Sequence, residues 1–392
     1  TSITFNISAA DSTNPNVNIT FPTTNNTNTT NANLNVNFTA SDTNLASVWY
    51  SNDTYLINRS LGSAGVYTNI TNLTWSQGSH TIIIYANDTA GNLNWSTRIS
   101  FTVDSVLPAI SIQIPAVNNT NTTNINQNIN ATYSDSSGID SVWYANDTFS
   151  AANKSLGSGN VFTNITNLTW SQGSHTVRFY TNDTFNNVNF TSISFTIDTT
   201  PPLVTISNPS QNNTNSSNTG FDVNYTATDS FTIVDSVWYN NDTFSVANKS
   251  LGSGGTYTNI SNLTWSDGNH IVRIYANDTL NNVNFTSISF TIDTINPNVN
   301  ITFPTTNGTN STNSNLNINY TVADINLASC WYSNDSYLAN TTLSNCGNIT
   351  TVTWSAQEHN VTIWVNDSSN NLNQTSITFN ISAADSTNPN VN

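Results

Sequence analysis

The chain has 392 residues and a formal net charge of −16, although only 7% of its residues are charged, against about 25% in typical globular proteins. With six basic residues in all, it lacks the cationic surface that binds nucleic acid or anionic lipid. No apolar run reaches the roughly 18 residues that a membrane-spanning helix needs. Low charge and abundant Asn are also typical of disordered segments, but periodic apolar residues and recurring Trp favour a folded core.

The predicted elements of the first repeat are all strands, because apolar and polar residues alternate and helical periodicity is absent. Residues 1–11 carry the last strand of a preceding domain, and the proline that ends the 11–15 junction predicts a short, stiff linker. In chain order, strands are then expected at 17–22, 34–40, 45–53, 55–62, 67–75, 81–86 and 95–103. About seven strands separated by turn signals predict an antiparallel β-sandwich.

Two tryptophans mark each repeat, and we expect both to be buried as anchors of one small core. The first set is Trp49, Trp143, Trp238 and Trp331, and the second set is Trp75, Trp170, Trp265 and Trp354. Their spacing is that of a small domain rather than of a solenoid repeat. The expected domains are 12–105, 106–199, 200–294 and 295–385, with 1–11 ending a preceding domain and 386–392 beginning the next.

The two ends of the chain are identical in sequence. Residues 1–18 recur letter for letter at 375–392. The set of four domains therefore begins to repeat as a whole, and we expect the chain to be part of a longer tandem array.

The second half of each repeat resembles that of immunoglobulin-like and fibronectin type III-like domains, which occur in tandem in archaeal and bacterial cell-surface proteins. The matching residues are Leu73-x4-Gly78-x-His80-x-Ile82-x-Ile84-x-Ala86-x-Asp88-x2-Gly91-Asn92 and the closing Phe101-Thr102-Val103-Asp104. The resemblance implies an all-β tandem array of four Ig-like antiparallel β-sandwich domains, an extracellular location, and a structural corner role for His80. It implies little about activity, because such domains serve as stalks, spacers, adhesins and surface-layer parts.

Asn-x-Ser/Thr sequons are dense and predict N-glycosylation in a secreted protein, although a chain rich in Asn and Thr also forms many by chance. Those between inward-facing apolar neighbours are expected to point out of the sheet. The candidates are Asn18, Asn25, Asn28, Asn37, Asn69, Asn72, Asn118, Asn121, Asn130, Asn164, Asn167, Asn212, Asn215, Asn224, Asn259, Asn262, Asn307, Asn310 and Asn319. Of these, the outward-pointing set is Asn18, Asn37, Asn130, Asn224 and Asn319.

Cys330 and Cys346 are the only cysteines, and both lie in the fourth domain. An extracellular location favours a disulfide between them, which would stabilise the domain by about 3 kcal/mol in the chain-entropy model. The alternative is a pair of free, buried thiols.

Aspartates recur at four positions of the repeat, represented by Asp42, Asp53, Asp88 and Asp104. Oxygen-rich clusters at domain junctions can bind Ca²⁺, so these four are candidate calcium ligands, and no other cofactor is expected. The alternative is turn chemistry, since Asp side chains bond their own backbone and the Asp-x-Asp-x-Asp loop of strong calcium sites is absent.

The sequence predicts a structural protein rather than an enzyme, because it contains no nucleophile elbow, phosphate-binding glycine loop or paired catalytic carboxylates. We expect an extracellular cell-surface fibre, stalk, sheath or surface-layer element, N-glycosylated and associating mainly with itself. The alternative is an adhesin that recognises glycans or another cell surface. A divergent, aromatic-rich loop in one domain would favour the adhesin, and none is evident.

Overall fold

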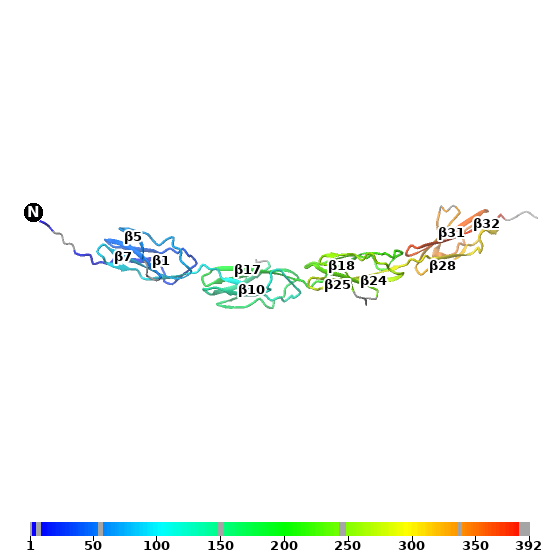
Figure 1. Cartoon of the computed structure of the whole chain (residues 1–392). Coiled ribbons are helices and arrows are strands. Elements are labelled where there is room, and N and C mark those ends of the chain that lie inside the picture. The colour runs from blue at the N-terminus through cyan, green and yellow to red at the C-terminus, as the bar shows by residue number, and fades with distance from the viewer. Residues whose placement is uncertain are drawn as a thin grey trace, which may run out of the picture. The chain divides into compact units, whose positions relative to one another are not determined.

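The computed structural model describes residues 2–4, 9–53, 58–147, 153–242, 248–335, 337 and 339–383. In this part of the chain the regular structure is all-β, apart from one short 3-10 helix, η1 (Ser344–Cys346) (Figure 1). The chain divides into two compact units, Thr1–Asp198 and Thr199–Asn392. Each unit contains two β-sandwich domains of the same plan, so the protein is a tandem array of four Ig-like domains.

The first domain pairs a two-stranded sheet with a larger sheet. The small sheet consists of β1 (Asn16–Phe21) and β3 (Asn37–Ser41). The larger sheet runs in the order β2 (Thr27–Thr29), β9 (Ile99–Val103), β7 (Gly78–Asp88), β4 (Leu45–Asn52), β5 (Asn58–Ser63) and β6 (Val66–Tyr67), and β8 (Leu93–Trp95) also pairs with β7. All pairs are antiparallel except β2 with β9, which are parallel.

The other three domains repeat this plan. The second contains β10 (Ala109–Ile114), β11 (Thr120–Thr122), β12 (Asn130–Ser134), β13 (Ile139–Asn146), β14 (Lys154–Ser158), β15 (Val161–Phe162), β16 (Gly173–Asp183) and β17 (Val188–Ile197). The third contains β18 (Leu203–Asn208), β19 (Thr214–Ser216), β20 (Asn224–Thr228), β21 (Val234–Asn241), β22 (Lys249–Ser253), β23 (Thr256–Tyr257), β24 (Gly268–Asp278) and β25 (Val283–Ile292). The fourth contains β26 (Asn298–Phe303), β27 (Thr309–Ser311), β28 (Asn319–Ala323), β29 (Leu327–Asn334), β30 (Thr341–Thr342), β31 (Glu358–Asp367) and β32 (Leu372–Ile381).

Each domain has its own apolar core, built from alternate residues of the facing strands. In the first domain Val48 and Tyr50 of β4 point inward and are 0% and 6% exposed. Trp75 is also buried there, and its indole N–H donates to the carbonyl oxygen of Leu34 at 2.8 Å. Burial of this ring therefore leaves no polar group of the side chain without a hydrogen-bond partner.

The expectation that both tryptophans of each repeat anchor the core is wrong for the first set. Because Val48 and Tyr50 occupy the inner face of β4, the intervening Trp49 must project from the outer face, where it is partly exposed. Its ring stacks on Tyr85 of β7, with centroids 5.8 Å apart and planes 7° apart. The same parity places Trp143, Trp238 and Trp331 outside the cores.

Candidate functional sites

Each domain holds a buried histidine. His80 in β7 is 6% exposed, its Nδ1 lies 3.1 Å from Oδ2 of Asp53, and its Nε2 lies 2.8 Å from the carbonyl oxygen of Ser76. A carboxylate oxygen and a carbonyl oxygen therefore face the two ring nitrogens. The rings of Trp75 and Phe101 lie 5.2 and 5.5 Å from the imidazole, measured between centroids.

This histidine–aspartate corner recurs in every domain. The further pairs are His175 with Asp147, His270 with Asp242, and His359 with Asp335. All four imidazoles are buried and have both ring nitrogens within reach of acceptors. An imidazole held in this way joins two segments of the chain rather than exchanging protons with a substrate, which is the structural role predicted for His80.

Asp53 belongs to this corner. Its Oδ1 accepts the backbone N–H of Thr81 at 3.0 Å, while its Oδ2 faces His80. Asp53 is not among the carboxylates that cluster in the described part of the chain. Of the four candidate calcium ligands, Asp53 therefore has a structural role in the histidine–aspartate corner instead.

Three other carboxylates meet at the start of the first domain. One oxygen each of Asp11, Asp42 and Asp88 lies within 4.8 Å of the other two. Asp42 and Asp88 were expected as candidate ligands, whereas Asp11 is missing from the expected set although it opens the 11–15 junction. Asp104, the equivalent of Asp11, lies in the cluster of the next domain. The corresponding clusters are Asp104, Asp135 and Asp183 in the second domain and Asp293, Asp324 and Asp367 in the fourth.

Tight loops hold these carboxylates in place. Asp88, at the end of β7, is 1% exposed and accepts hydrogen bonds from the backbone N–H of Asn92 at 2.8 Å and from its Nδ2 at 2.7 Å. Hydrogen bonds from the hydroxyl and then the backbone N–H of Thr13 lower the pKa of Asp11, so that carboxyl is ionised at neutral pH. Oxygen ligands without nitrogen or sulfur suit hard cations such as Ca²⁺.

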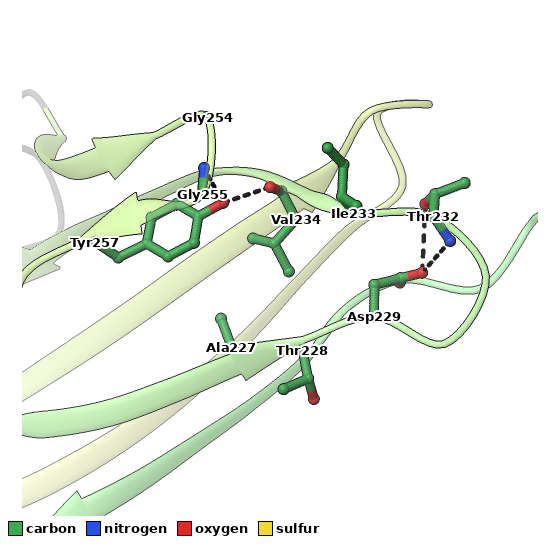
Figure 2. A pocket seen from close by; sticks show the side chains of 9 residues that line it. All are labelled: Ala227, Thr228, Asp229, Thr232, Ile233, Val234, Gly254, Gly255 and Tyr257. Carbon is green, nitrogen blue, oxygen red and sulfur yellow. Dashed lines mark hydrogen bonds between the residues drawn. The ribbon is translucent and has the colours of Figure 1, made fainter.

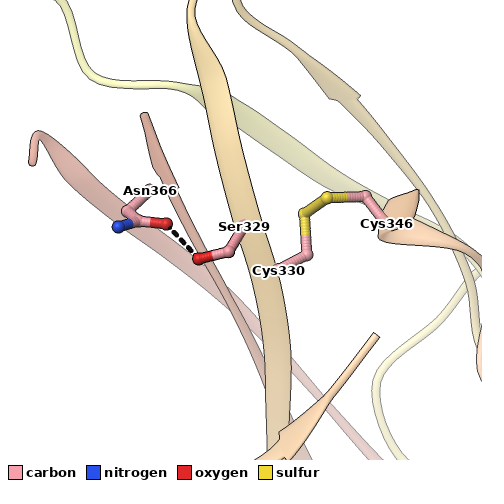
Figure 3. The surroundings of a disulfide bond; sticks show 4 residues. All are labelled: Ser329, Cys330, Cys346 and Asn366. Carbon is pink, nitrogen blue, oxygen red and sulfur yellow. Dashed lines mark hydrogen bonds between the residues drawn. A yellow bond between two sulfur atoms is a disulfide. The ribbon is translucent and has the colours of Figure 1, made fainter. Parts of the chain in front are cut away.

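A disulfide joins Cys330 to Cys346 in the fourth domain (Figure 3). Cys330 is 1% exposed and holds the inward position of β29 that Val48 holds in β4. Cys346 lies in η1, which follows the short strand β30 where the first domain has the β5–β6 hairpin. The bond therefore ties a segment that lacks part of its sheet pairing to the centre of the domain.

Most of the candidate sequons are exposed, and the partly buried ones are four of the five strand sequons that were expected to point outward. Asn18 is exposed, and the other four are partly buried, although the residues on either side of each pack in the core and the Asn therefore lies on the opposite face of its strand. These four are Asn37, Asn130, Asn224 and Asn319. The Oδ1 of Asn130 is fully buried. Each of the four directly follows a residue that forms an isolated bridge with another loop, as Val36 does with Ile70.

In one exposed loop sequon of each domain, the side-chain amide oxygen of the Asn accepts a hydrogen bond from the backbone. The Oδ1 of Asn25 accepts the backbone N–H of Ser100 at 2.7 Å, which leaves its Nδ2, the atom that carries an N-linked glycan, outside this bond. The same contact is made by Asn118, Asn212 and Asn307. Loop conformation and glycan attachment are therefore compatible at these four positions.

An aromatic row crosses the outer face of each larger sheet. In the first domain Trp49, Tyr85 and Trp95 are neighbours across β4, β7 and β8, and Trp95 is 57% exposed. The equivalent outer aromatic rows are Trp143–Tyr180–Phe190, Trp238–Tyr275–Phe285 and the shorter Trp331–Trp364. Guanidinium groups lie over two of the exposed rings, Arg178 at 5.1 Å from Phe190 and Arg273 at 4.8 Å from Phe285.

A hollow of about 390 Å³ opens at one end of the third domain (Figure 2). The hydroxyl of Tyr257 donates to the carbonyl oxygen of Val234 and accepts the N–H of Gly255 at 3.2 Å. Asp229 accepts the N–H of Thr232 at 2.8 Å. The hydroxyl of Tyr257 and the Oδ1 of Asp229 thus hold turns, and the side chains drawn around the hollow form no nucleophile–base pair.

The fold and these sites define a tandem Ig-like protein, and residues 160–252 match the family model described as bacterial Ig-like domain (group 3). No curated protein matches the chain in sequence. Among the described residues, none of the helices is long and apolar enough to cross a membrane.

Several solved structures share the β-sandwich repeat. Fibronectin(III)-like modules of Clostridium thermocellum CbhA are 17% identical, cover 46% of this chain and 94% of their own, and give a TM-score of 0.26. A tetra-tandem repeat from the extending region of a large adhesion protein is 17% identical, with 94% and 99% coverage and a TM-score of 0.31. Extracellular cadherin domains 3–6 of protocadherin gamma B2 are 12% identical, with 93% and 99% coverage and a TM-score of 0.37. The Ig-like assignment rests on the strand pairing of each domain rather than on these superpositions.

Proposed function

We propose that this chain is a structural segment of an extracellular protein, in which Ig-like domains in series bear mechanical load. The observation that carries the proposal is that every domain uses its one histidine in the same way. The histidine–aspartate corner is present four times, and its imidazole is always buried and hydrogen-bonded. A catalytic or binding site would distinguish one domain from the others, as sites are grafted onto a fold locally.

Three features support an extracellular location. The disulfide Cys330–Cys346 suits an oxidising compartment. The surface is rich in Asn, Ser and Thr rather than in charges, and exposed loop sequons recur in each domain. N-linked glycans on these loops would supply the hydration that a low density of charged groups does not.

Self-association is part of this proposal. Outward Asn and Thr side chains of neighbouring copies can hydrogen-bond without the repulsion that dense like charges would cause. Because the same surface recurs along the chain, any lateral contact would be multiplied by the number of domains that meet at once. The arrangement suits a fibre, stalk or sheath.

An adhesin is the second candidate function, because the chemistry of the outer aromatic rows would suit the binding of a ligand. Exposed rings with a guanidinium above them, such as Phe190 with Arg178, resemble the amphipathic contact groups that bind sugars or proteins. Their presence in three domains, and in shortened form in the fourth, agrees better with a repeated self-contact than with one specialised site.

Sedimentation velocity on the purified chain with its native glycans separates the two functions. A structural element is expected to show sedimentation coefficients that rise with protein concentration, and electron microscopy should show filaments or bundles. The paired variant Phe190→Ser with Phe285→Ser tests whether the rows take part, with the exposed Val161→Ser as its control. A chain that stays monomeric at all concentrations and binds a defined saccharide at micromolar affinity would replace this proposal with the adhesin.

A further inference from the structure

The carboxylate cluster of the second domain contains an oxygen that its surroundings do not satisfy. Asp104 is 5% exposed, and its Oδ1 accepts the N–H of Val106 at 3.0 Å. Its Oδ2 is fully buried and has no hydrogen-bond partner. Buried carboxylate oxygens are normally paired with a donor or a cation, so this atom calls for a ligand.

The other members of the cluster add negative charge at the same place. Asp183 is 0% exposed, Asp135 is partly buried, and one oxygen of each residue lies within 4.8 Å of one oxygen of Asp104. None of the four histidine–aspartate pairs involves this cluster. Three carboxylates held together without a cation repel one another and lose hydration.

Turn chemistry explains only part of this geometry. The Oδ1 of Asp135 accepts the N–H and the hydroxyl of Ser137 at 2.8 and 2.7 Å, and Oδ1 of Asp104 closes its own turn with Val106. A turn of this kind needs one carboxylate oxygen. It gives no reason for the burial of the second oxygen of Asp104 beside two further carboxylates.

In the fourth domain, the carboxylate oxygen equivalent to Oδ2 of Asp104 has a hydrogen-bond donor. There Asp293 replaces Asp104, and its Oδ2 accepts Nδ2 of Asn326 at 3.0 Å. Ser137 stands at the position of Asn326 in the second domain, and its hydroxyl donates to Asp135 instead. Of these two clusters, the one in the second domain therefore has the carboxylate oxygen without a donor.

We propose that Asp104, Asp135 and Asp183 bind a hard divalent cation, Ca²⁺ at extracellular concentrations, and that the first- and fourth-domain clusters are weaker sites of the same kind. Three carboxylates provide oxygen ligands only, and water can complete the six to eight that Ca²⁺ takes. A hollow of about 270 Å³ bordered by Asp104 and Ser137 gives the ion a path to the cluster.

The position of Asp104 gives the cation a mechanical role. Its backbone N–H donates to the carbonyl oxygen of Thr29 in the first domain at 3.0 Å, and its own carbonyl oxygen accepts Nδ2 of Asn187 in the second domain at 2.9 Å. A cation held by Asp104 and by the loops of Asp135 and Asp183 would fix the linker to the second domain. This inference goes beyond the proposed function and stands on binding alone, so it can hold or fail whether or not the chain bears load.

Calorimetric titration of the full chain with CaCl₂, after removal of metal with EDTA and at about 0.15 M NaCl, tests the site. The wild type is expected to bind Ca²⁺ saturably, with a dissociation constant of about 10⁻⁴ to 10⁻³ M for the tightest site. Asp104→Asn keeps the turn acceptor and removes one charge, and it should lose one equivalent of bound calcium. Ser137→Asn keeps the charge but supplies the missing donor, and it should weaken that site at least tenfold. Asp222→Asn, which removes an exposed carboxylate outside the clusters, is the charge-matched control and should bind as the wild type does.

Thermal unfolding separates binding from a purely structural role. Calcium should raise the unfolding temperature of the wild type, whereas Asp104→Asn should match or exceed the wild type in EDTA and gain less from calcium. Near-ultraviolet circular dichroism checks that Asp104→Asn is folded. If it is not folded, Asp135→Asn, at a partly buried carboxylate, gives the same test. The proposal is overturned if the wild type shows no saturable calcium heat, or if Asp104→Asn, Asp135→Asn and wild type titrate alike. It is also overturned if the folded variant loses the same stability with and without calcium.

Discussion

His80 and Asp53 join strand β7 to the end of β4 through a hydrogen bond of 3.1 Å between Nδ1 and Oδ2. The other ring nitrogen of His80 binds the carbonyl oxygen of Ser76 at 2.8 Å, so the imidazole closes the loop that enters β7. The arrangement explains why a residue type common in active sites recurs in each repeat without any sign of catalysis.

Replacing His80 by Phe tests this corner. The ring volume is kept, but Ser76 and Asp53 lose their donors, and a buried unsatisfied acceptor costs about 1–3 kcal/mol. Urea unfolding should show a loss of that size in the free energy of unfolding of the first domain. The neighbouring exposed Ser79→Ala should change it by less than about 0.5 kcal/mol. Equal stability of His80→Phe and wild type would mean that the corner is not structural.

The two tryptophans of one domain should differ in their effect on stability. Trp75→Ala removes a ring that is 3% exposed and leaves a cavity, which costs about 3–5 kcal/mol. Trp49→Ala removes a partly exposed ring and one stacking partner, and about 1–2 kcal/mol is expected. Chemical denaturation of both variants gives the comparison. A larger loss for Trp49→Ala would place the wrong tryptophan in the core.

The disulfide is expected to stabilise the fourth domain alone. The double variant Cys330→Val with Cys346→Ser restores the valine that the first three domains have at this position, so it isolates the effect of closing the loop. With a sequence separation of 16 between the cysteines, the chain-entropy model gives a loss of about 3 kcal/mol. Differential scanning calorimetry should show one transition shifted down and the others unchanged. A shift of every transition would contradict a local role.

Alkaline pH should destabilise the third and fourth domains through buried phenols. Burial raises the pKa of Tyr225 to about 12, with a further contribution from Tyr257, and burial raises that of Tyr320 to about 12. The unfolded chain releases these protons near the ordinary value of 10.0, whereas the folded chain retains them. Stability is therefore complete below pH 10 and is lost as pH rises from about 10 to about 12. Tyr225→Phe and Tyr320→Phe should reduce that loss in denaturation curves measured at pH 8 and pH 11, and curves that fall as steeply as the wild type would exclude these residues as the cause.

Glycosylation should be concentrated on the exposed loop sequons. Peptide mapping of native material is expected to find glycans at Asn25 and Asn118 and to leave the partly buried Asn130 unmodified. The intact mass should exceed the 42.5 kDa of the polypeptide. Occupancy at Asn130 equal to that at Asn25 would show that modification does not follow the folded surface.

The fold was predictable because the alternation of apolar and polar residues and the turn residues are local signals. Which face of a strand is buried is not always visible from such local signals. Val48, Trp49 and Tyr50 are all apolar, so the pattern around them does not show which face is buried. The expected strand 67–75 is also wrong, because Asn72 has a φ of 60° and interrupts it, leaving Ile70 in an isolated bridge with Val36.

The candidate sites were predictable only in part. Aspartate positions are visible in the sequence, but the grouping of Asp11 with Asp42 and Asp88 depends on three loops that meet only in the folded domain. The pairing of Asp53 with His80 is equally nonlocal. Sequence spacing alone cannot assign such residues to a shared site, because the strands that bring them together lie far apart along the chain.

Pulling the full chain from its two ends in a single-molecule force experiment tests most directly whether the domains bear load in series. We expect one unfolding step for each domain, refolding on relaxation, and a shorter step for the domain whose 16-residue separation is locked by the disulfide. A reducing agent should lengthen that step alone by about 55 Å, the extended length of the released segment. A single cooperative step, or extension without discrete steps, would contradict a series of independent load-bearing domains.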